Sequence, residues 1–196
     1  MKALIIVDVQ YDFLPGGSLE VPRGDEIIPI INNIQKDYDL VVATQDWHPA
    51  DHLSFASQHD GKLPFEKIDL DGLDQILWPD HCIQESYGSE ISEELNTSRI
   101  ETIFRKGMDP NIDSYSGFYD NGKRKDTGLS GYLKARKIDE VHVCGLAADF
   151  CVYFTAMDSI AEGFKTSIIS KATKAIDKGE FMEKKNTFIQ AGGTLI

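Results

Sequence analysis

The chain has 196 residues, a length that one domain with a full-sized hydrophobic core can account for. Hydrophobic residues make up 41% and charged residues 27%, which is ordinary for a globular protein and argues against disorder. The net charge is -12 with no large basic block, so nucleic acid and anionic membranes are disfavoured as partners, because binding either needs concentrated positive charge.

Short β-branched runs alternate along the chain with longer amphipathic segments. The runs predict strands buried on both faces, and they lie at 2–8, 39–46, 100–107, 139–146, 165–170 and 194–196. The amphipathic segments predict helices by apolar spacing or a capping pattern, and they lie at 24–37, 89–96, 126–138, 151–164 and 179–193. This alternation predicts an α/β fold of three αβα layers, with a doubly wound parallel sheet of about six strands.

Nothing in the sequence indicates a division into parts. No repeat, low-complexity tract or linker interrupts the alternation, so residues 1–196 are predicted to form a single domain. The least regular stretch runs from Trp47 to Ser89 and is rich in His, Pro, Asp and Gly. A connection that long inside a compact domain is usually functional, so we expect it to fold over one end of the sheet.

The cysteines and the first residues indicate in which cellular compartment the protein is expected. Three cysteines are an odd number, and they lack the close spacing of a secreted disulfide scaffold. The opening MKALIIVDVQ is a short apolar run interrupted by Asp8, which does not fit a signal peptide, and no segment is long enough to span a bilayer. We therefore expect a cytoplasmic protein with reduced thiols.

Five reactive side chains are predicted to lie at one edge of the sheet. The carboxyl ends of parallel strands form the ligand site in open α/β sheets, and the residues near these ends are Asp8, Asp46, His48, Lys106 and Cys151. A helix start and a nearby cation would lower the pKa of the thiol, and Asp8 with Lys106 could move its proton. Taken singly, a buried structural cysteine, a turn-capping aspartate and a solvated lysine are equally ordinary interpretations.

The segments DWHPADH and WPDHC suggest a metal site. Asp46 and His48 are two residues apart, so an extended backbone points both side chains the same way, and His81 would come from the long loop. One carboxylate and two imidazoles suit Zn²⁺ or Fe²⁺ with coordination positions left open. His52 is a fourth candidate, as a ligand or as a partner of one. Nearby aromatic residues predict a pocket for a flat ligand, and they are Phe13, Trp47, Trp78, Tyr115 and Phe118.

Five segments together resemble the nicotinamidase and pyrazinamidase branch of the isochorismatase-like hydrolases. In chain order they are IIVDVQYDFLPGGSL, TQDWHPADHLSFAS, LWPDHCIQ, IFRKGMDPNIDSYSGFYDNG and GLAADFCVYFTAMDSIAEGF. The resemblance extends from about Leu4 to Ser170. It implies the isochorismatase-like fold and hydrolysis of nicotinamide to nicotinate and ammonia in NAD salvage, through a thioester on Cys151, with pyrazinamide as a further substrate.

The resemblance also implies a catalytic triad, a metal site and a substrate pocket. The matching residues are Asp8, Lys106 and Cys151 for the triad, Asp46, His48 and His81 for a divalent metal, and Phe13, Trp78, Tyr115 and Ala147 for the substrate. We expect the metal to be Zn²⁺, with Fe²⁺ or Mn²⁺ as alternatives. A cis peptide is implied before Ala147, so that the amides of Ala147 and Cys151 form an oxyanion hole. Ala148 departs from the family pattern, which commonly has Thr there.

Three other functions stay open at this point. A related cysteine amidase or isochorismatase-like hydrolase would act on another small substrate. A metallohydrolase would use a metal-bound hydroxide, with Cys151 as packing, and a non-catalytic module would bind a ring ligand without turnover. The expected partner is a small molecule, nicotinamide first, and the sequence leaves open whether the chain forms a homo-oligomer.

Overall fold

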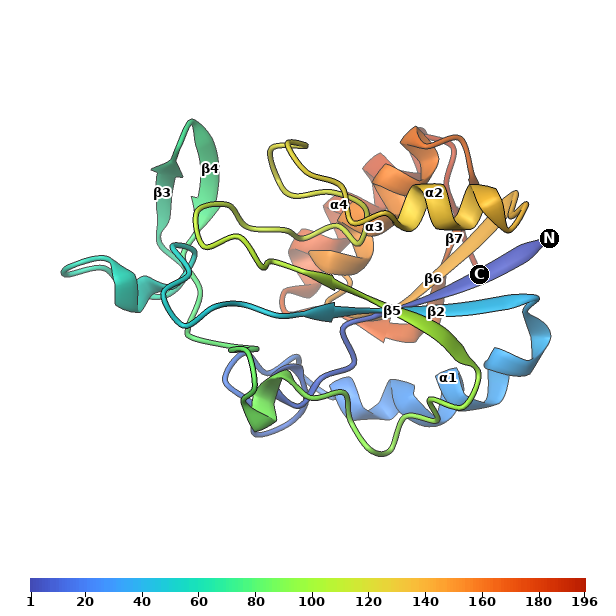
Figure 1. The fold of residues 1–196 in the computed structure, drawn as a ribbon, viewed down its shortest axis with the longest axis horizontal. Helices are drawn as coiled ribbons and strands as arrows, with labels where there is room; N and C mark the ends of the chain where they lie inside the picture. Colours follow the sequence, from blue (N-terminus) through green and yellow to red (C-terminus); the bar gives the residue numbers. More distant parts are fainter.

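In the computed structural model, which describes residues 1–196, a six-stranded sheet forms the centre of the molecule (Figure 1). The strands are all parallel and lie in the order β5-β2-β1-β6-β7-β8. Their bounds are β1 Lys2–Val7, β2 Leu40–Asp46, β5 Ile100–Lys106, β6 Glu140–Leu146, β7 Lys165–Lys174 and β8 Thr194–Leu195. The predicted parallel sheet is therefore confirmed.

Strand β1 lies between β2 and β6 because its sequence is apolar on both faces. Residues 3–7, with the sequence ALIIV, are fully buried. Burial of each large aliphatic side chain contributes roughly 1.5–3 kcal/mol, which makes this strand a main source of stability. The next residue, Asp8, has a φ of 48°, a left-handed conformation that turns the backbone away and leaves its carboxyl group at the carboxyl end of the strand.

Helices cover both faces of the sheet (Figure 1). One face carries α1 (Ile28–Ile34) with the flanking 3-10 turns η2 (Gly24–Ile27) and η3 (Gln35–Asp37). The other carries α2 (Leu129–Ala135), α3 (Cys151–Ala161) and α4 (Lys178–Gln190). The three αβα layers are as predicted. No helix combines the length and the apolar character that crossing a bilayer requires.

The predicted helix at 89–96 is wrong. Only the 3-10 turn η5 (Tyr87–Ser89) is helical there. The Tyr11 N–H donates to the Glu90 carbonyl at 3.2 Å, and the Ser92 N–H donates to the Val9 carbonyl at 3.0 Å. Backbone groups paired with the segment after β1 cannot form helical bonds, so long-range pairing outweighs the local capping pattern.

The long connection between β2 and β5 contains a hairpin that the sequence analysis missed. Strands β3 (Lys67–Leu70) and β4 (Leu73–Ile76) pair antiparallel, apart from the main sheet. Asp71 and Gly72 form the turn, both with positive φ. An Asp-Gly pair between short strands is the usual signal for this turn and could have revealed it. The remaining 3-10 turns are η1 (Tyr11–Phe13) and η4 (Ala56–Gln58).

Candidate active site

Side chains from four elements meet at the carboxyl edge of the sheet. Asp8 follows β1, Asp46 ends β2, Lys106 ends β5, and Cys151 begins α3 shortly after β6. Asp46 and Lys106 are direct neighbours in the pairing of β2 with β5. The exposed fractions of the four residues run from 0 to 6%. The strand-end rule therefore places these residues correctly, in a site that excludes most water.

Lys106 connects the other three groups. Its Nζ donates hydrogen bonds to Asp46 Oδ1 at 2.7 Å, to the Ser114 carbonyl at 3.0 Å and to Cys151 Sγ at 3.4 Å. An ammonium group has three protons, and these three contacts use them all. Nζ also lies 2.9 Å from Asp8 Oδ2. Asp8 Oδ2 lies close to the ammonium charge but has no hydrogen-bond partner, so it can still accept a proton.

Asp8 is placed to exchange a proton with Cys151, since a carboxylate oxygen and the sulfur lie within 4.8 Å. The Thr44 hydroxyl donates to Asp8 Oδ1 at 2.6 Å, which leaves Oδ2 as the accepting oxygen. Burial raises the pKa of Asp8, against the opposing charge of Lys106. Burial also raises the pKa of the Cys151 thiol, again opposed by Lys106. This direction is opposite to the lowered pKa that the sequence suggested, and a raised thiol pKa makes a nearby base more important for activation.

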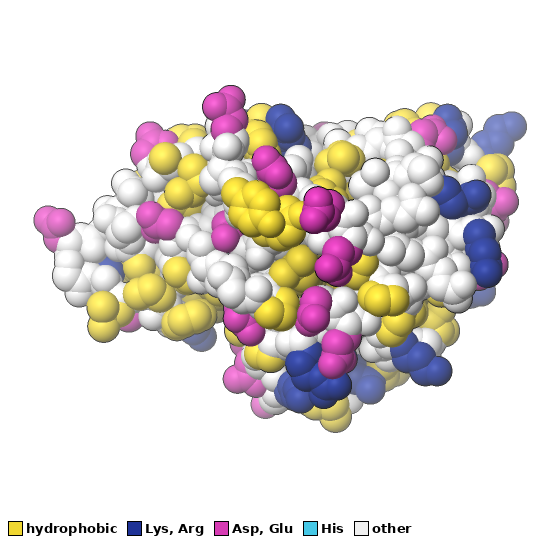
Figure 2. Space-filling model, turned by 90° about the horizontal axis from the view of Figure 1, so that it is seen from below, with side chains coloured by type: hydrophobic (Ala, Val, Ile, Leu, Met, Phe, Trp, Pro, Cys, Tyr) yellow, Lys and Arg dark blue, Asp and Glu magenta, His cyan; other side chains and the backbone are white.

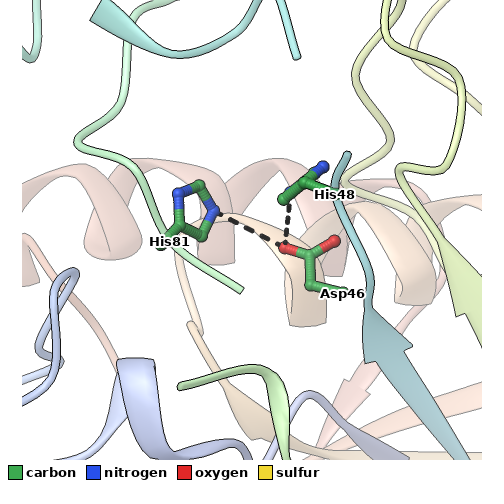
Figure 3. Close-up of side chains that lie close together, drawn as sticks. All are labelled: Asp46, His48 and His81. Carbon is green, nitrogen blue, oxygen red and sulfur yellow. Dashed lines mark ion pairs between the residues drawn. The ribbon is translucent and has the colours of Figure 1, made fainter. Parts of the chain in front are cut away.

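Asp46, His48 and His81 form the candidate metal site (Figure 3). His48 Nε2 lies 3.3 Å and His81 Nε2 lies 3.7 Å from Asp46 Oδ2. On the far side of the rings, His48 Nδ1 donates to the Gly107 carbonyl at 2.9 Å, and His81 Nδ1 donates to the Pro79 carbonyl at 2.8 Å. In the neutral rings both Nε2 atoms then carry lone pairs, which face a carboxylate. Three electron donors around one space fit a divalent cation.

His52 lies beside this set, with its ring turned to Ser54. The Ser54 amide and hydroxyl both donate to His52 Nδ1, at 3.1 and 2.8 Å. Nε2 therefore carries the proton of the neutral ring, and it is buried without a hydrogen-bond partner. Burial lowers the pKa of His52 to about 4, so the ring stays neutral. His52 also lies with His48 and Asp113 in a second group of possible metal ligands, whose ligand atoms are within 4.8 Å of one another.

The four substrate-binding candidates line a single cavity that reaches Cys151. The cavity is narrow, with a volume of about 20 Å³ for the centre of a water-sized molecule. Its lining includes Phe13, Trp78, Tyr115 and Ala147, together with Asp46, His81 and Cys151. Trp78 Nε1 donates to the Tyr115 hydroxyl at 3.2 Å, which fixes two of the aromatic walls relative to each other. A flat, partly apolar ring is the ligand shape that such walls accept.

The segment between β6 and α3 presents unpaired amides to this cavity. The peptide bond between Leu146 and Ala147 is cis, as expected. Neither the Ala147 N–H nor the Cys151 N–H donates to a backbone carbonyl, whereas the Ala148 N–H donates to the Lys174 carbonyl at 2.7 Å. Two free donors beside a nucleophile can stabilise a developing oxyanion. Because both donors are backbone groups, alanine at position 148 leaves them in place.

Four further residues line the cavity without having been predicted from the sequence, namely Leu19, Asp113, Phe150 and Ile176. Ile176 lies beyond the segments that carry the family resemblance. It is tied to the segment before Cys151 by Asp149, whose carboxylate accepts from the amides of Ile176 at 3.0 Å and Asp177 at 2.7 Å. The sequence held no signal for this contact, because the fold decides both the burial of Asp149 and the return of the chain to it.

The fold is a three-layer α/β fold, and its site places a cysteine beside an aspartate and a lysine. The family model of the isochorismatase domain matches residues 2–196, and the chain belongs to this family. A nicotinamidase of Acinetobacter baylyi is 49% identical to the chain over 175 residues, which cover 89% of this chain and 82% of the relative.

Solved structures give the same result. The Acinetobacter baumanii nicotinamidase pyrazinamidase has a TM-score of 0.97 at 48% identity, covering 100% of this chain and 95% of that chain. A protein of L. infantum in complex with nicotinate has a TM-score of 0.89 at 38% identity, covering 100% and 92%. A pyrazinamidase of Pyrococcus horikoshii in complex with zinc has a TM-score of 0.82 at 32% identity, covering 100% and 98%. The predicted fold and family are confirmed.

Proposed function

We propose that this chain hydrolyses nicotinamide to nicotinate and ammonia in NAD salvage, and that it also hydrolyses pyrazinamide. The observation that carries the proposal is the contact of Cys151 with Lys106 and the open oxygen of Asp8, at the end of an aromatic cavity. The nicotinamidase names of the relatives and the nicotinate bound to the L. infantum protein support the choice of substrate.

Each residue of the triad has a defined part. Asp8 takes the thiol proton as Cys151 Sγ attacks the amide carbon and forms a C–S bond. The carbonyl oxygen becomes an oxyanion that accepts from the Ala147 and Cys151 amides, each donor contributing roughly 3 kcal/mol. Asp8 returns the proton to the nitrogen as the C–N bond breaks and ammonia leaves. Water then attacks the thioester and gives a proton through Asp8 to the departing sulfur. Lys106 contacts both Asp8 and Cys151, so its charge stabilises the negative charge on whichever of the two carries it.

A divalent metal fits Asp46, His48 and His81, and we propose Zn²⁺. One carboxylate and two neutral imidazoles suit this ion, and the related pyrazinamidase of Pyrococcus horikoshii was solved with zinc. When bound, the ion supplies a Lewis acid for the ring nitrogen of the substrate. The aromatic walls orient the ring, since well-oriented groups recover several kcal/mol of the barrier. Metal analysis of the purified protein separates Zn²⁺ from Fe²⁺ and Mn²⁺.

We further propose that residues 1–196 act as one domain in the cytoplasm, with a small molecule as the partner. All three cysteines are free thiols, as a reducing compartment would keep them. On the face shown in Figure 2, acidic side chains are spread widely and basic ones do not form one continuous area. A surface of this kind gives no support to binding of nucleic acid or of an anionic membrane.

Ammonia release from nicotinamide tests the proposal, with two cysteine variants compared. Cys151→Ala is expected to lose nearly all turnover. Cys144→Ala is the matched control, since Cys144 is equally buried but lies within β6, where its Sγ contacts the Ile5 carbonyl at 3.7 Å. Appreciable turnover by Cys151→Ala would refute the covalent mechanism and favour a metal-bound hydroxide. Equal turnover of amides without a ring nitrogen would instead indicate a related amidase.

A further inference from the structure

Gln10 is fully buried, and its side-chain amide pairs with the backbone of Asp46. Gln10 Oε1 accepts from the Asp46 N–H at 2.8 Å, and Gln10 Nε2 donates to the Asp46 carbonyl at 2.8 Å. The second Nε2 proton goes to the Ser89 carbonyl at 2.9 Å. One side chain thus satisfies both backbone groups of a candidate metal ligand and ties them to a third segment.

The topology of the sheet explains why Asp46 needs this partner. The pairing of β1 with β2 ends at Ile6 and Ala43, and the backbone turns away at Asp8. The Asp46 N–H and carbonyl on the β1 side would therefore be buried without a strand to pair with. A buried backbone group without a partner costs roughly 1–3 kcal/mol. The amide of Gln10 takes the place of the missing strand.

We propose that Gln10 is a positioning residue for the metal-binding carboxylate, an inference that rests on the metal site proposed above. Gln10 fixes the backbone of Asp46, and Lys106 Nζ holds Asp46 Oδ1 at 2.7 Å. With both ends of this short side chain fixed, Oδ2 has a single position, facing His48 and His81. Groups that orient a metal ligand in this way raise metal affinity, because the ligand loses less freedom when the metal binds.

Gln45 provides a matched control. It is the residue before Asp46, is only 7% exposed, and donates to the same Ser89 carbonyl at 2.9 Å. Its Oε1 accepts from Arg105 Nε at 3.1 Å, and its amide makes no hydrogen bond to Asp46. The variants to compare are Gln10→Ala, Gln10→Glu and Gln45→Ala. Gln10→Glu keeps the shape and the acceptor, but its carboxylate has no proton for the two carbonyls.

The measurement is Zn²⁺ affinity, by titrating metal-free full-length protein in competition with a chromophoric chelator. We expect the Kd for Zn²⁺ to rise roughly 10- to 100-fold in both Gln10 variants and less than about threefold in Gln45→Ala. Thermal unfolding of the metal-free proteins verifies that each variant is folded. Saturating Zn²⁺ fills the site even when the affinity is weak. At saturating Zn²⁺ the kcat of Gln10→Glu should therefore come close to that of wild type.

Three results would overturn the proposal. They are wild-type Zn²⁺ affinity in folded Gln10→Glu, an equal loss in Gln45→Ala, and failure of both Gln10 variants to fold while Gln45→Ala folds. The last would assign Gln10 to stability of the fold alone. Because Zn²⁺ binding is measured without substrate, wild-type protein that binds Zn²⁺ but releases no ammonia would contradict the proposed function and leave the role of Gln10 intact.

Discussion

Replacing Lys106 with methionine is expected to destabilise the protein strongly, because it leaves Asp8 and Asp46 buried without their shared cation. The three side chains are 0 to 5% exposed. Burial alone would lower the pKa of Lys106, but the carboxylates of Asp46 and Asp8 raise it well above its usual value, so the ammonium is charged. Removing one partner of a buried ion pair costs about 3–5 kcal/mol. Methionine retains the apolar part of the lysine side chain, so the loss of stability measures the contribution of the charge.

Thermal unfolding of the metal-free protein measures this effect. One kcal/mol shifts the Tm of a domain of this size by roughly 2–4 °C, so we expect Lys106→Met to lower it by about 6–20 °C. Lys123→Met is the control, because Lys123 pairs with Asp158 at 2.8 Å but is 60% exposed, and such pairs contribute at most about 1 kcal/mol. Adding Asp8→Asn to Lys106→Met should recover part of the loss without restoring activity. Equal Tm shifts in the two lysine variants, or no recovery in the double variant, would refute the reasoning.

Three further predictions concern the scaffold. Gly145→Ala should prevent stable folding, because the new methyl group would lie 2.0 Å from the Val7 carbonyl oxygen and the residue has a φ of 110°. Gly16→Ala is the control, since Gly16 has a φ of 88° but lies in open space, and it should cost about 1 kcal/mol. Equal urea midpoints for the two variants would contradict this prediction. Burial lowers the pKa of His142, so the unfolded chain takes up the proton first, and the stability advantage of wild type over His142→Phe should shrink as pH falls below about 6.5. Urea unfolding at about pH 7.5 and about pH 5 measures this advantage, and a constant difference would argue against it. Asp177→Ala removes the carboxylate that caps α4 and should cost about 1 kcal/mol, a Tm shift of roughly 2–4 °C, and an unchanged Tm would show that the cap contributes nothing.

The sheet and its reactive edge could be predicted because both follow from local patterns. Asp8 and Lys106 each end a strand-forming run, and parallel strands bring such ends together whatever the loops do. The segment 89–96 could not be predicted, since its hydrogen bonds reach residues 9–11, far away in the chain. The raised pKa of Cys151 was also out of reach, because the direction of the shift depends on burial, which the sequence does not show.

The charges of the site explain how a proton can be transferred within a buried active site. Transfer of the thiol proton from Cys151 to Asp8 moves a negative charge from one to the other without changing the net charge of the site. Lys106 contacts both groups, so its attraction is retained before and after the transfer. It also holds Asp46, and therefore one cation serves both the proposed triad and the proposed metal-binding carboxylate. The site is then electrostatically a single unit.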